Sequence, residues 1–252
     1  MNVQRYFLDD TQFEDKYVII AGDDSKHIQK VMRMNEGDQI ICCNKAGDCY
    51  LSRIEEIEPE KVRASLQKEE ERMCEIPVHV TIACGLTKSD KLEWVIQKGT
   101  EMGAYACIPF EAERSVVKLN GKKAAKKHER WNKIAKEAAE QSHRKRVPEV
   151  HELAAFKRLL SEIDKYDHVL VAYEEEARND EKSRLVNTLS KADEGDTILL
   201  IFGPEGGFSD REIDELVRAG AGTCALGPRI LRAETAPLYA LSAISYHIEF
   251  LR

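Results

Sequence analysis

Short apolar runs alternate with polar residues through the first part of the chain. The runs read VQRYF, YVII, DQIICC, CYLSRI and KVRASL, and glycine, asparagine and proline residues separate them. Such alternation is typical of a small β-rich domain. Between two of these runs, the segment SKHIQKVMRM spaces Ile28, Val31 and Met32 like one face of a helix, which predicts a single short helix.

The hydrophobic pattern changes after a charged segment. QKEEERMCEIP, residues 67–77, has no apolar period and ends at a proline, so it is the best candidate for a linker. We therefore expect an N-terminal domain at residues 1–72 and a second domain at residues 73–252.

Strands and helices alternate through the second domain. Buried strands are predicted at VHVTIAC, ACIPF, HVLVAY and TILLIF, and helices at 89–103, 126–142, 180–190 and 210–219. Asp90 and Glu93 resemble a capping box at the start of the first of these helices. The alternation predicts an α/β fold with a mainly parallel sheet.

The last predicted helix is apolar on nearly every side. It opens near Thr235, with Pro237 in its first turn, and its apolar residues continue to Phe250. A helix of this kind must be buried on several sides, either inside its domain or against a partner. Because a terminal helix seldom achieves this within one monomer, we expect a homodimer.

Composition narrows the class of protein. The chain has 252 residues, of which 33 % are charged and 42 % hydrophobic, which is typical of a globular protein. No stretch reaches the roughly 18 apolar residues that a membrane span needs, so we expect a soluble cytoplasmic protein without a membrane partner. Seven cysteines, with no C-x-x-C pair, predict reduced core residues, and neither a disulfide framework nor a metal site.

Positive charge is concentrated in one segment. The formal net charge is -7, yet residues 114–146 hold twelve Lys and Arg residues against three Glu. Because a polyanion responds to the local field of a basic stripe, this segment is a candidate track for an RNA or DNA backbone. A solvated helix face is the simpler alternative. The candidate contacts are Arg114, Lys122, Lys123, Lys126, Arg130, Lys133, Arg144, Lys145 and Arg146.

A glycine-rich loop follows the strand TILLIF. The sequence FGPEGGFSDRE has neither the P-loop lysine nor the G-x-G-x-x-G spacing, and Glu205 would repel a phosphate. A ligand with hydroxyls, an amino group or a positive centre therefore fits better. The alternative is a tight turn in which Gly206 and Gly207 supply positive φ. Ser209 and Glu212 predict a capping box for the helix that follows.

Four separated segments resemble the RsmE-like ribosomal RNA methyltransferases of the SPOUT class. The segments are DKLEWVIQKGTEMG, ERS with RWNKIAKEAAEQSHRKRVP, FGPEGGFSDRE and LGPRILRAETA. The resemblance covers the whole chain. It implies a PUA-like β-barrel followed by a SPOUT domain with a trefoil knot, S-adenosylmethionine as methyl donor, and a homodimer. It also implies 16S ribosomal RNA of the small subunit as substrate, methylated at N3 of a uridine.

Family residues carry over onto the matching positions of this chain. The resemblance places the cofactor against Ile201, Phe202, Gly203, Pro204, Glu205, Gly206, Leu226, Gly227, Arg229, Ile230, Leu231 and Ala233. At Ala233 we expect many relatives to carry a hydroxyl residue, which this chain lacks. The backbone of such a loop can approach a ligand closely, and an acidic side chain tolerates a sulfonium.

Methylation at N3 requires removal of a proton and stabilisation of charge on the uracil oxygens. Glu205 or Glu234 is the candidate base, and Arg232 or Arg114 the candidate charge stabiliser, with Arg114 supplied by the same or the other subunit. Each has a simpler alternative. Glu234 would only stabilise the start of the last helix through the helix dipole, and Arg114 would only bind a phosphate.

Two other functions stay open at the level of sequence. One is a SPOUT enzyme that methylates a ribose 2'-hydroxyl of transfer RNA, and the other is a non-catalytic RNA-binding factor for ribosome assembly. Detection of adenosylmethionine binding separates the second from both enzymes, and nucleoside analysis separates base from ribose methylation.

Overall fold

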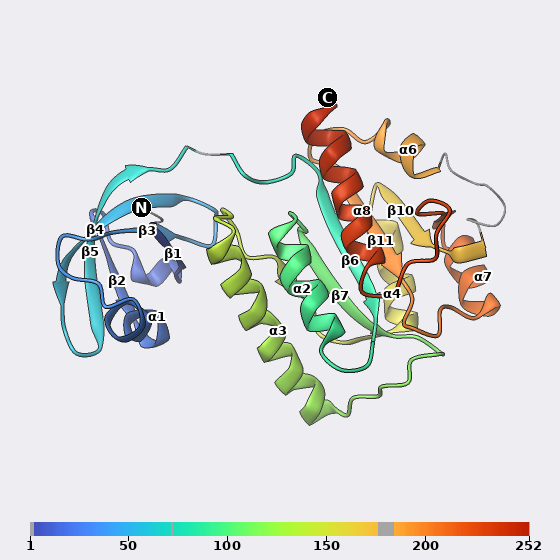
Figure 1. Cartoon of the computed structure of the whole chain (residues 1–252), viewed down its shortest axis with the longest axis horizontal. Coiled ribbons are helices and arrows are strands. Elements are labelled where there is room, and N and C mark those ends of the chain that lie inside the picture. Colours follow the sequence, from blue (N-terminus) through green and yellow to red (C-terminus); the bar gives the residue numbers. More distant parts are fainter. Residues whose placement is uncertain (1–2, 72, 176–183, 252) are drawn as a thin grey trace. The chain divides into compact units, whose positions relative to one another are not determined.

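The computed structural model describes residues 3–71, 73–175 and 184–251 (Figure 1). The chain divides into two compact units. One comprises Met1–Glu75 together with Ala139–Val147, and the other comprises Ile76–Ala138 and Pro148–Arg252. The first break falls inside the charged segment that predicted a linker. The predicted first domain, residues 1–72, lacks the segment 139–147, which belongs to the first unit.

The first unit is built on a five-stranded sheet in the order β1-β3-β4-β5-β2. Its strands are β1 (Gln4–Phe7), β2 (Tyr17–Ala21), β3 (Gln39–Cys43), β4 (Cys49–Ile57) and β5 (Lys61–Glu69). β1 and β3 are parallel, and the other pairs are antiparallel. Ile20, Ile40 and Ile54 share one buried core. The β-rich N-terminal domain predicted from the alternating runs is confirmed.

A short helical segment follows β2, as predicted. α1 (Gly22–Lys26) continues into a π-helical turn at His27–Val31. Ile28 is buried, but Val31 is 65 % exposed and Met32 38 % exposed. The predicted apolar face is therefore wrong for these last two residues, because the wider π-helical turn changes the directions in which successive side chains point.

The second unit contains a seven-stranded parallel sheet. Its strands are β6 (His79–Gly85), β7 (Ala106–Glu111), β8 (Glu149–Val150), β9 (Ala154–Ala155), β10 (His168–Ala172), β11 (Thr197–Phe202) and β12 (Gly222–Cys224). The order is β12-β10-β11-β6-β7-β8, and β9 also pairs with β7. Helical connections return the chain to the same end of the sheet, which allows parallel pairing. The predicted α/β fold is confirmed, and the trefoil knot stays a prediction.

Helices connect these strands. They are α2 (Lys91–Glu101), α3 (Gly121–Gln141), α4 (Phe156–Glu162), α6 (Arg184–Leu189), α7 (Asp210–Arg218) and α8 (Ala236–Ser245), with turns at Ile163–Lys165 and Tyr246–Phe250. α3 starts at Gly121, before the predicted residue 126. At this start the Asn120 side chain accepts a hydrogen bond from the Lys123 amide. Of the helix predicted over 180–190, residues 180–183 lie outside the described residues.

Two capping boxes were predicted, and one is present. Ser209 accepts a hydrogen bond from the Glu212 amide, and the Glu212 side chain accepts one from the Ser209 amide. At the start of α2, Asp90 makes no capping hydrogen bond. The prediction there is wrong because Glu93 instead binds Lys127 and Arg130 of α3.

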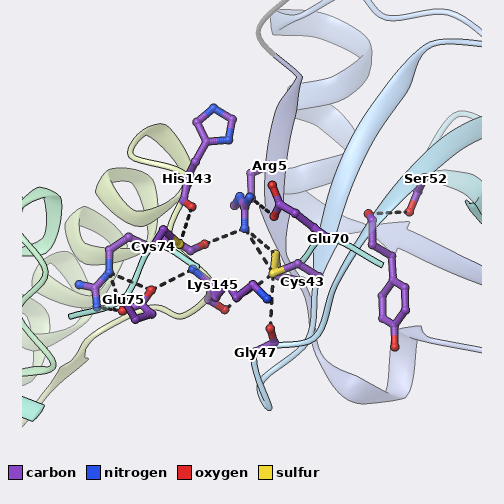
Figure 2. A network of polar contacts seen from close by, with 12 residues as sticks. Arg5, Cys43, Gly47, Ser52, Glu70, Cys74, Glu75, His143 and Lys145 are labelled. Carbon is purple, nitrogen blue, oxygen red and sulfur yellow. Dashed lines mark hydrogen bonds and ion pairs between the residues drawn. A yellow bond between two sulfur atoms is a disulfide. The ribbon is translucent and has the colours of Figure 1, made fainter. Parts of the chain in front are cut away.

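The cysteine prediction needs a correction. Cys43 and Cys49 face each other at the closed end of the β3–β4 hairpin and form a disulfide (Figure 2). Their separation along the sequence does not reveal the antiparallel register that brings them together. Cys42, Cys84 and Cys107 are buried, as expected of small core residues. Within the described residues, no helix combines the length and apolar character needed to cross a membrane.

Candidate functional site

A cavity of about 510 Å³ lies in the second unit, at the carboxyl ends of β10 and β11. In open parallel sheets this edge is where ligands bind, and the volume suits a small-molecule ligand. Its lining comes from five parts of the chain. The lining residues are Lys91, Arg114, Ala172, Tyr173, Glu174, Phe202, Gly203, Pro204, Glu205, Gly206, Gly207, Phe208, Ile230, Leu231, Arg232, Ala233, Glu234 and Ala236.

Most of the cofactor residues predicted from the resemblance lie in this wall. Leu226, Gly227 and Arg229 line a smaller adjoining hollow that shares Ile230 and Leu231 with the main cavity. The remaining predicted residue, Ile201, is buried within β11 and does not line the cavity. The structure thus brings the GPEGG loop and the LGPRILRAETA segment, which α7 and β12 separate along the chain, to one cavity.

The glycines of the GPEGG loop serve different purposes. Gly207 has a φ of +68°, which glycine adopts without strain. Gly206 does not have a positive φ, which corrects the prediction, and a Cβ there would lie 3.0 Å from the Cβ of Arg114. A Cβ on Gly203 would lie 3.2 Å from the Phe208 ring. Close packing, more than backbone conformation, therefore requires glycine at these two positions.

One further glycine escaped the sequence prediction. Gly85 ends β6, and a Cβ added there would lie 2.6 Å from Pro204 Cδ and 2.7 Å from Pro204 N. The end of β6 therefore touches the backbone of the GPEGG loop. A glycine directly after a buried strand was the available signal, but its neighbour is more than a hundred residues away.

Glu205 is held by the loop between β6 and α2. Its Oε1 accepts a hydrogen bond from the Lys88 amide at 3.1 Å and lies 3.2 Å from Lys91 Nζ. Burial acts to raise the pKa of Glu205, but hydrogen bonds from its own amide, from Lys88 and from Lys91 outweigh it and lower the pKa below its usual value. Glu205 is therefore ionised at neutral pH.

Lys91 also reaches the second candidate base. Its Nζ lies 3.3 Å from Glu234 Oε2, so one ammonium lies between two carboxylates. The hydrogen bond to Glu205 is the largest cause that raises the pKa of Lys91, and Glu234 adds to it. Lys91 was not predicted as a site residue, because its partners Glu205 and Glu234 lie more than a hundred residues further along the sequence.

Two arginines complete the cavity wall. Arg114 Nη1 donates a hydrogen bond to the Gly206 carbonyl at 3.3 Å, so Arg114 reaches the cavity of its own chain. The preceding residue ties this segment to α7, since the Glu113 amide donates to Glu212 Oε1 at 2.8 Å. Arg232 is exposed at the wall formed by the LGPRILRAETA segment. Both guanidinium groups are therefore available to a ligand that enters from solvent.

The predicted basic track is partly engaged within the protein. Lys122, Lys123 and Lys126 on α3 are exposed. Arg130, although exposed, donates from Nε to Glu93 Oε2 at 2.8 Å. Lys133 lies 3.9 Å from Glu137 on its own helix. The exposed cations nearest the start of α3 are therefore the better candidates for contact with a nucleic acid.

Arg144 departs from the predicted exposed strip. It is 3 % exposed and pairs with Glu75, and its carbonyl accepts a hydrogen bond from Arg5 Nη1 at 2.9 Å. Figure 2 shows Arg5 also directed at Cys43, and the Lys145 amide directed at Glu75. Arg144 thus attaches residues 139–147 to the first unit, because a buried guanidinium requires partners.

Two family models match the chain, and their boundary lies close to the first break between the two units. A family model described as an RNA methyltransferase domain matches residues 74–245, and one described as an RNA methyltransferase PUA domain matches residues 20–67. The chain belongs to this family of RNA methyltransferases. The second match agrees with the β-rich first unit, and the first match contains the whole candidate cavity.

Individual members of the RNA methyltransferase family resemble the chain over its full length. Ribosomal RNA small subunit methyltransferase E of Bacillus subtilis (strain 168) is 51 % identical over 253 residues, which cover 99 % of both chains. The structure of ribosomal RNA small subunit methyltransferase E from Neisseria gonorrhoeae bound to S-adenosyl methionine is 27 % identical, with a TM-score of 0.85 and 97 % of each chain covered. A Legionella pneumophila methyltransferase solved with SAM is 28 % identical, with a TM-score of 0.85, and the match covers 97 % of this chain and 98 % of that one.

Proposed function

We propose that this protein transfers the methyl group of S-adenosylmethionine to N3 of a uridine in 16S ribosomal RNA. The observation that carries the proposal is the meeting of the GPEGG loop and the LGPRILRAETA segment around one cavity at the carboxyl edge of a parallel sheet. The names of the relatives from Bacillus subtilis and Neisseria gonorrhoeae support the substrate class.

The residues present fit adenosylmethionine. Gly203 and Gly206 line the cavity, and glycine presents its backbone to a ligand without an intervening side chain. Carboxylates at Glu205 and Glu234 suit a positively charged sulfonium and disfavour a phosphate. Residues of the GPEGG loop, with Leu226, Gly227 and the segment Arg229–Ala233, would hold the donor. When bound, it supplies an electrophilic methyl group.

The chain must also make the uracil nitrogen nucleophilic. N3 carries a proton at neutral pH, so the reaction needs a group that accepts it. Glu205 already accepts hydrogen bonds from Lys88 and Lys91, and its pKa is lowered, which makes it a weak base. Glu234, with a side chain that is 18 % exposed, is the better candidate for proton acceptance.

Negative charge on the uracil carbonyl oxygens requires a cationic partner. Arg232 is exposed in the cavity wall and comes from the segment next to Glu234. A planar guanidinium can donate two hydrogen bonds to such oxygens. We assign this role to Arg232, and a contact with RNA near the cavity to Arg114.

Partners and location follow from the proposed substrate. Lys122, Lys123 and Lys126 would contact the RNA backbone. A second copy of the chain would cover the exposed aromatic residues of the last helix and its continuation. A protein that modifies ribosomal RNA would act in the cytoplasm, where the small subunit is assembled.

The decisive experiment is nucleoside mass spectrometry. Ribosomal RNA and transfer RNA from a strain that lacks this protein are incubated with the purified protein and isotopically labelled adenosylmethionine. We expect labelled 3-methyluridine in 16S RNA. Label on a ribose, or in transfer RNA, would support the related ribose methyltransferase instead. No transfer to any RNA, despite adenosylmethionine binding, would contradict the proposed activity.

A further inference from the structure

Three chain segments meet at one side chain in the cavity wall. Lys91 is the first residue of α2, Glu205 belongs to the GPEGG loop, and Glu234 precedes α8. Lys91 Nζ lies 3.2 Å from Glu205 Oε1 and 3.3 Å from Glu234 Oε2. The three side chains are 34 %, 27 % and 18 % exposed, so water only partly screens these charges.

The connection between β6 and α2 is fitted closely to the GPEGG loop. Gly85 approaches Pro204 so closely that a Cβ would overlap it, and the Lys88 amide donates to Glu205. Ser89 has a φ of +57°, a conformation that residues other than glycine rarely adopt. Such strain persists only where the surrounding contacts fix the backbone. Lys91 therefore extends from a backbone that is already set against the loop.

The charges of the three groups do not balance. One ammonium and two carboxylates leave a net charge of -1, so without Lys91 the two carboxylates would repel each other across the cavity wall. With Lys91 present, both carboxylates are held near one nitrogen, and one negative charge in excess is retained. That excess suits a sulfonium more than a neutral thioether.

We propose that Lys91 is a positioning residue for the methyl donor: it holds Glu205 and Glu234 in place and thereby sets two loops of the cavity. The inference rests on the proposed function, because it takes adenosylmethionine as the ligand of this cavity. Lys91 acts through the two carboxylates and does not take part in the chemistry.

Calorimetric titration of the full-length protein with adenosylmethionine tests the proposal. Lys91→Met keeps an unbranched side chain only one atom shorter and removes the charge. We expect its Kd for adenosylmethionine to rise at least about tenfold, as for loss of a charge-assisted contact. Lys91→Arg keeps the charge and should recover most of the affinity. The matched control is Lys88→Met, which also removes a positive charge but leaves the main-chain hydrogen bond to Glu205 intact.

A double-mutant cycle separates positioning from a general effect on folding. In the Glu205→Gln background, Lys91→Met should raise the Kd by clearly less than in the wild type, because one partner of Lys91 is already neutral. An equal increase in both backgrounds would overturn the proposed route through Glu205. If Lys91→Met does not fold, Lys91→Gln takes its place in the same cycle.

The possible failures are distinct. Unchanged affinity in Lys91→Met, with normal binding by the wild type, would overturn this inference and leave the proposed function standing. Equal losses in Lys91→Met and Lys88→Met would also overturn it, since total charge would then explain the effect. Absence of adenosylmethionine binding by the wild type would overturn the proposed function and this inference together.

Discussion

At the scale of single residues, the cavity depends on three glycines, which have no Cβ. Gly85, Gly203 and Gly206 each lie where a Cβ would contact a neighbouring segment at 3.2 Å or less. Only close approach of the backbone explains glycine at these places, because none of the three has a positive φ. The shape of the site is therefore sensitive to single methyl groups.

Gly85→Ala tests this sensitivity. The added Cβ would lie 2.6 Å from Pro204 Cδ, so the GPEGG loop must move. We expect adenosylmethionine affinity to fall by about tenfold or more, with a smaller loss of thermal stability. The control is Gly121→Ala, since nothing lies within 4 Å of a Cβ there. Unchanged affinity for Gly85→Ala would show that this contact does not shape the site.

Arg232 offers a test of catalysis itself. If its guanidinium stabilises charge that grows only in the transition state, Arg232→Ala should slow single-turnover methylation by roughly a hundredfold or more. The affinities for RNA and for adenosylmethionine should change little, and Arg232→Lys should recover only part of the rate. Arg218→Ala, on the exposed surface of α7, is the control. Equal rates at saturating RNA would contradict the catalytic role and favour a phosphate contact, which changes RNA affinity instead.

At the scale of elements, α2 and α3 are joined by a buried carboxylate. Glu93 is 6 % exposed and lies 2.6 Å from Lys127 Nζ and 2.7 Å from Arg130 Nη2. Burial acts to raise the pKa of Glu93, but hydrogen bonds and charges from Lys127 and Arg130 outweigh it and lower the pKa. One negative side chain of α2 thus positions the basic helix.

This pairing predicts how stability depends on pH. A carboxyl group whose pKa is lowered by folding stabilises the protein above its ordinary pKa of 4.5, and that contribution is lost as pH falls through the folded-state value. At pH 7, Glu93→Gln should lower the free energy of unfolding by about 1–3 kcal/mol, as for a charged hydrogen bond. The difference from wild type should disappear in acid. Urea unfolding of both proteins between pH 7 and pH 3 measures this difference in unfolding free energy. A difference independent of pH would contradict the stabilising role of ionised Glu93.

The exposed start of α3 predicts the response of RNA binding to salt. Lys122→Glu with Lys126→Glu should weaken binding and flatten its dependence on salt concentration, because fewer counterions are released. Lys157→Glu with Arg158→Glu, a reversal of equal charge on exposed residues of α4, is the control. An unchanged salt slope in the first variant would show that the charged face of α3 is only solvated and does not contact RNA.

At the scale of the whole molecule, α8 is only partly covered by its own chain. Ala240, Leu241 and Ile244 are buried, and the helix packs against α2, β6 and β11 (Figure 1). Tyr246 and Phe250, in the turn that continues it, are 60 % and 76 % exposed, and their rings stack. Adjacent exposed aromatic residues are where we expect the second copy of the proposed homodimer to bind.

The proposed homodimer can be tested at this surface. Tyr246→Glu with Phe250→Glu should give a folded monomer in analytical ultracentrifugation, because both rings are exposed within one chain. Val186→Glu, on an exposed position of α6, is the control for added charge. Ile244→Asp is unsuitable, since Ile244 is fully buried and its replacement would unfold the chain itself. A double variant that still sediments as a dimer would place the interface elsewhere.

The sequence by itself determined the types of element and their order. Apolar periods of two and of 3.6 residues are local, so alternating strands and helices, the Ser209 cap and the β-rich first domain could be predicted. The resemblance carried by GPEGG and LGPRILRAETA also implied most of the cavity wall, because each motif is a continuous segment.

Only the tertiary structure decided which distant segments meet. Lys91 lines the cavity and Gly85 contacts the GPEGG loop because β6 lies beside β11 in the sheet, a neighbour relation that no local pattern contains. Pairing across the β3–β4 hairpin likewise joins Cys43 to Cys49, and the return of residues 139–147 to the first unit buries Arg144. Residue type and spacing set local conformation, whereas charge pairing and burial depend on neighbours that the whole fold supplies.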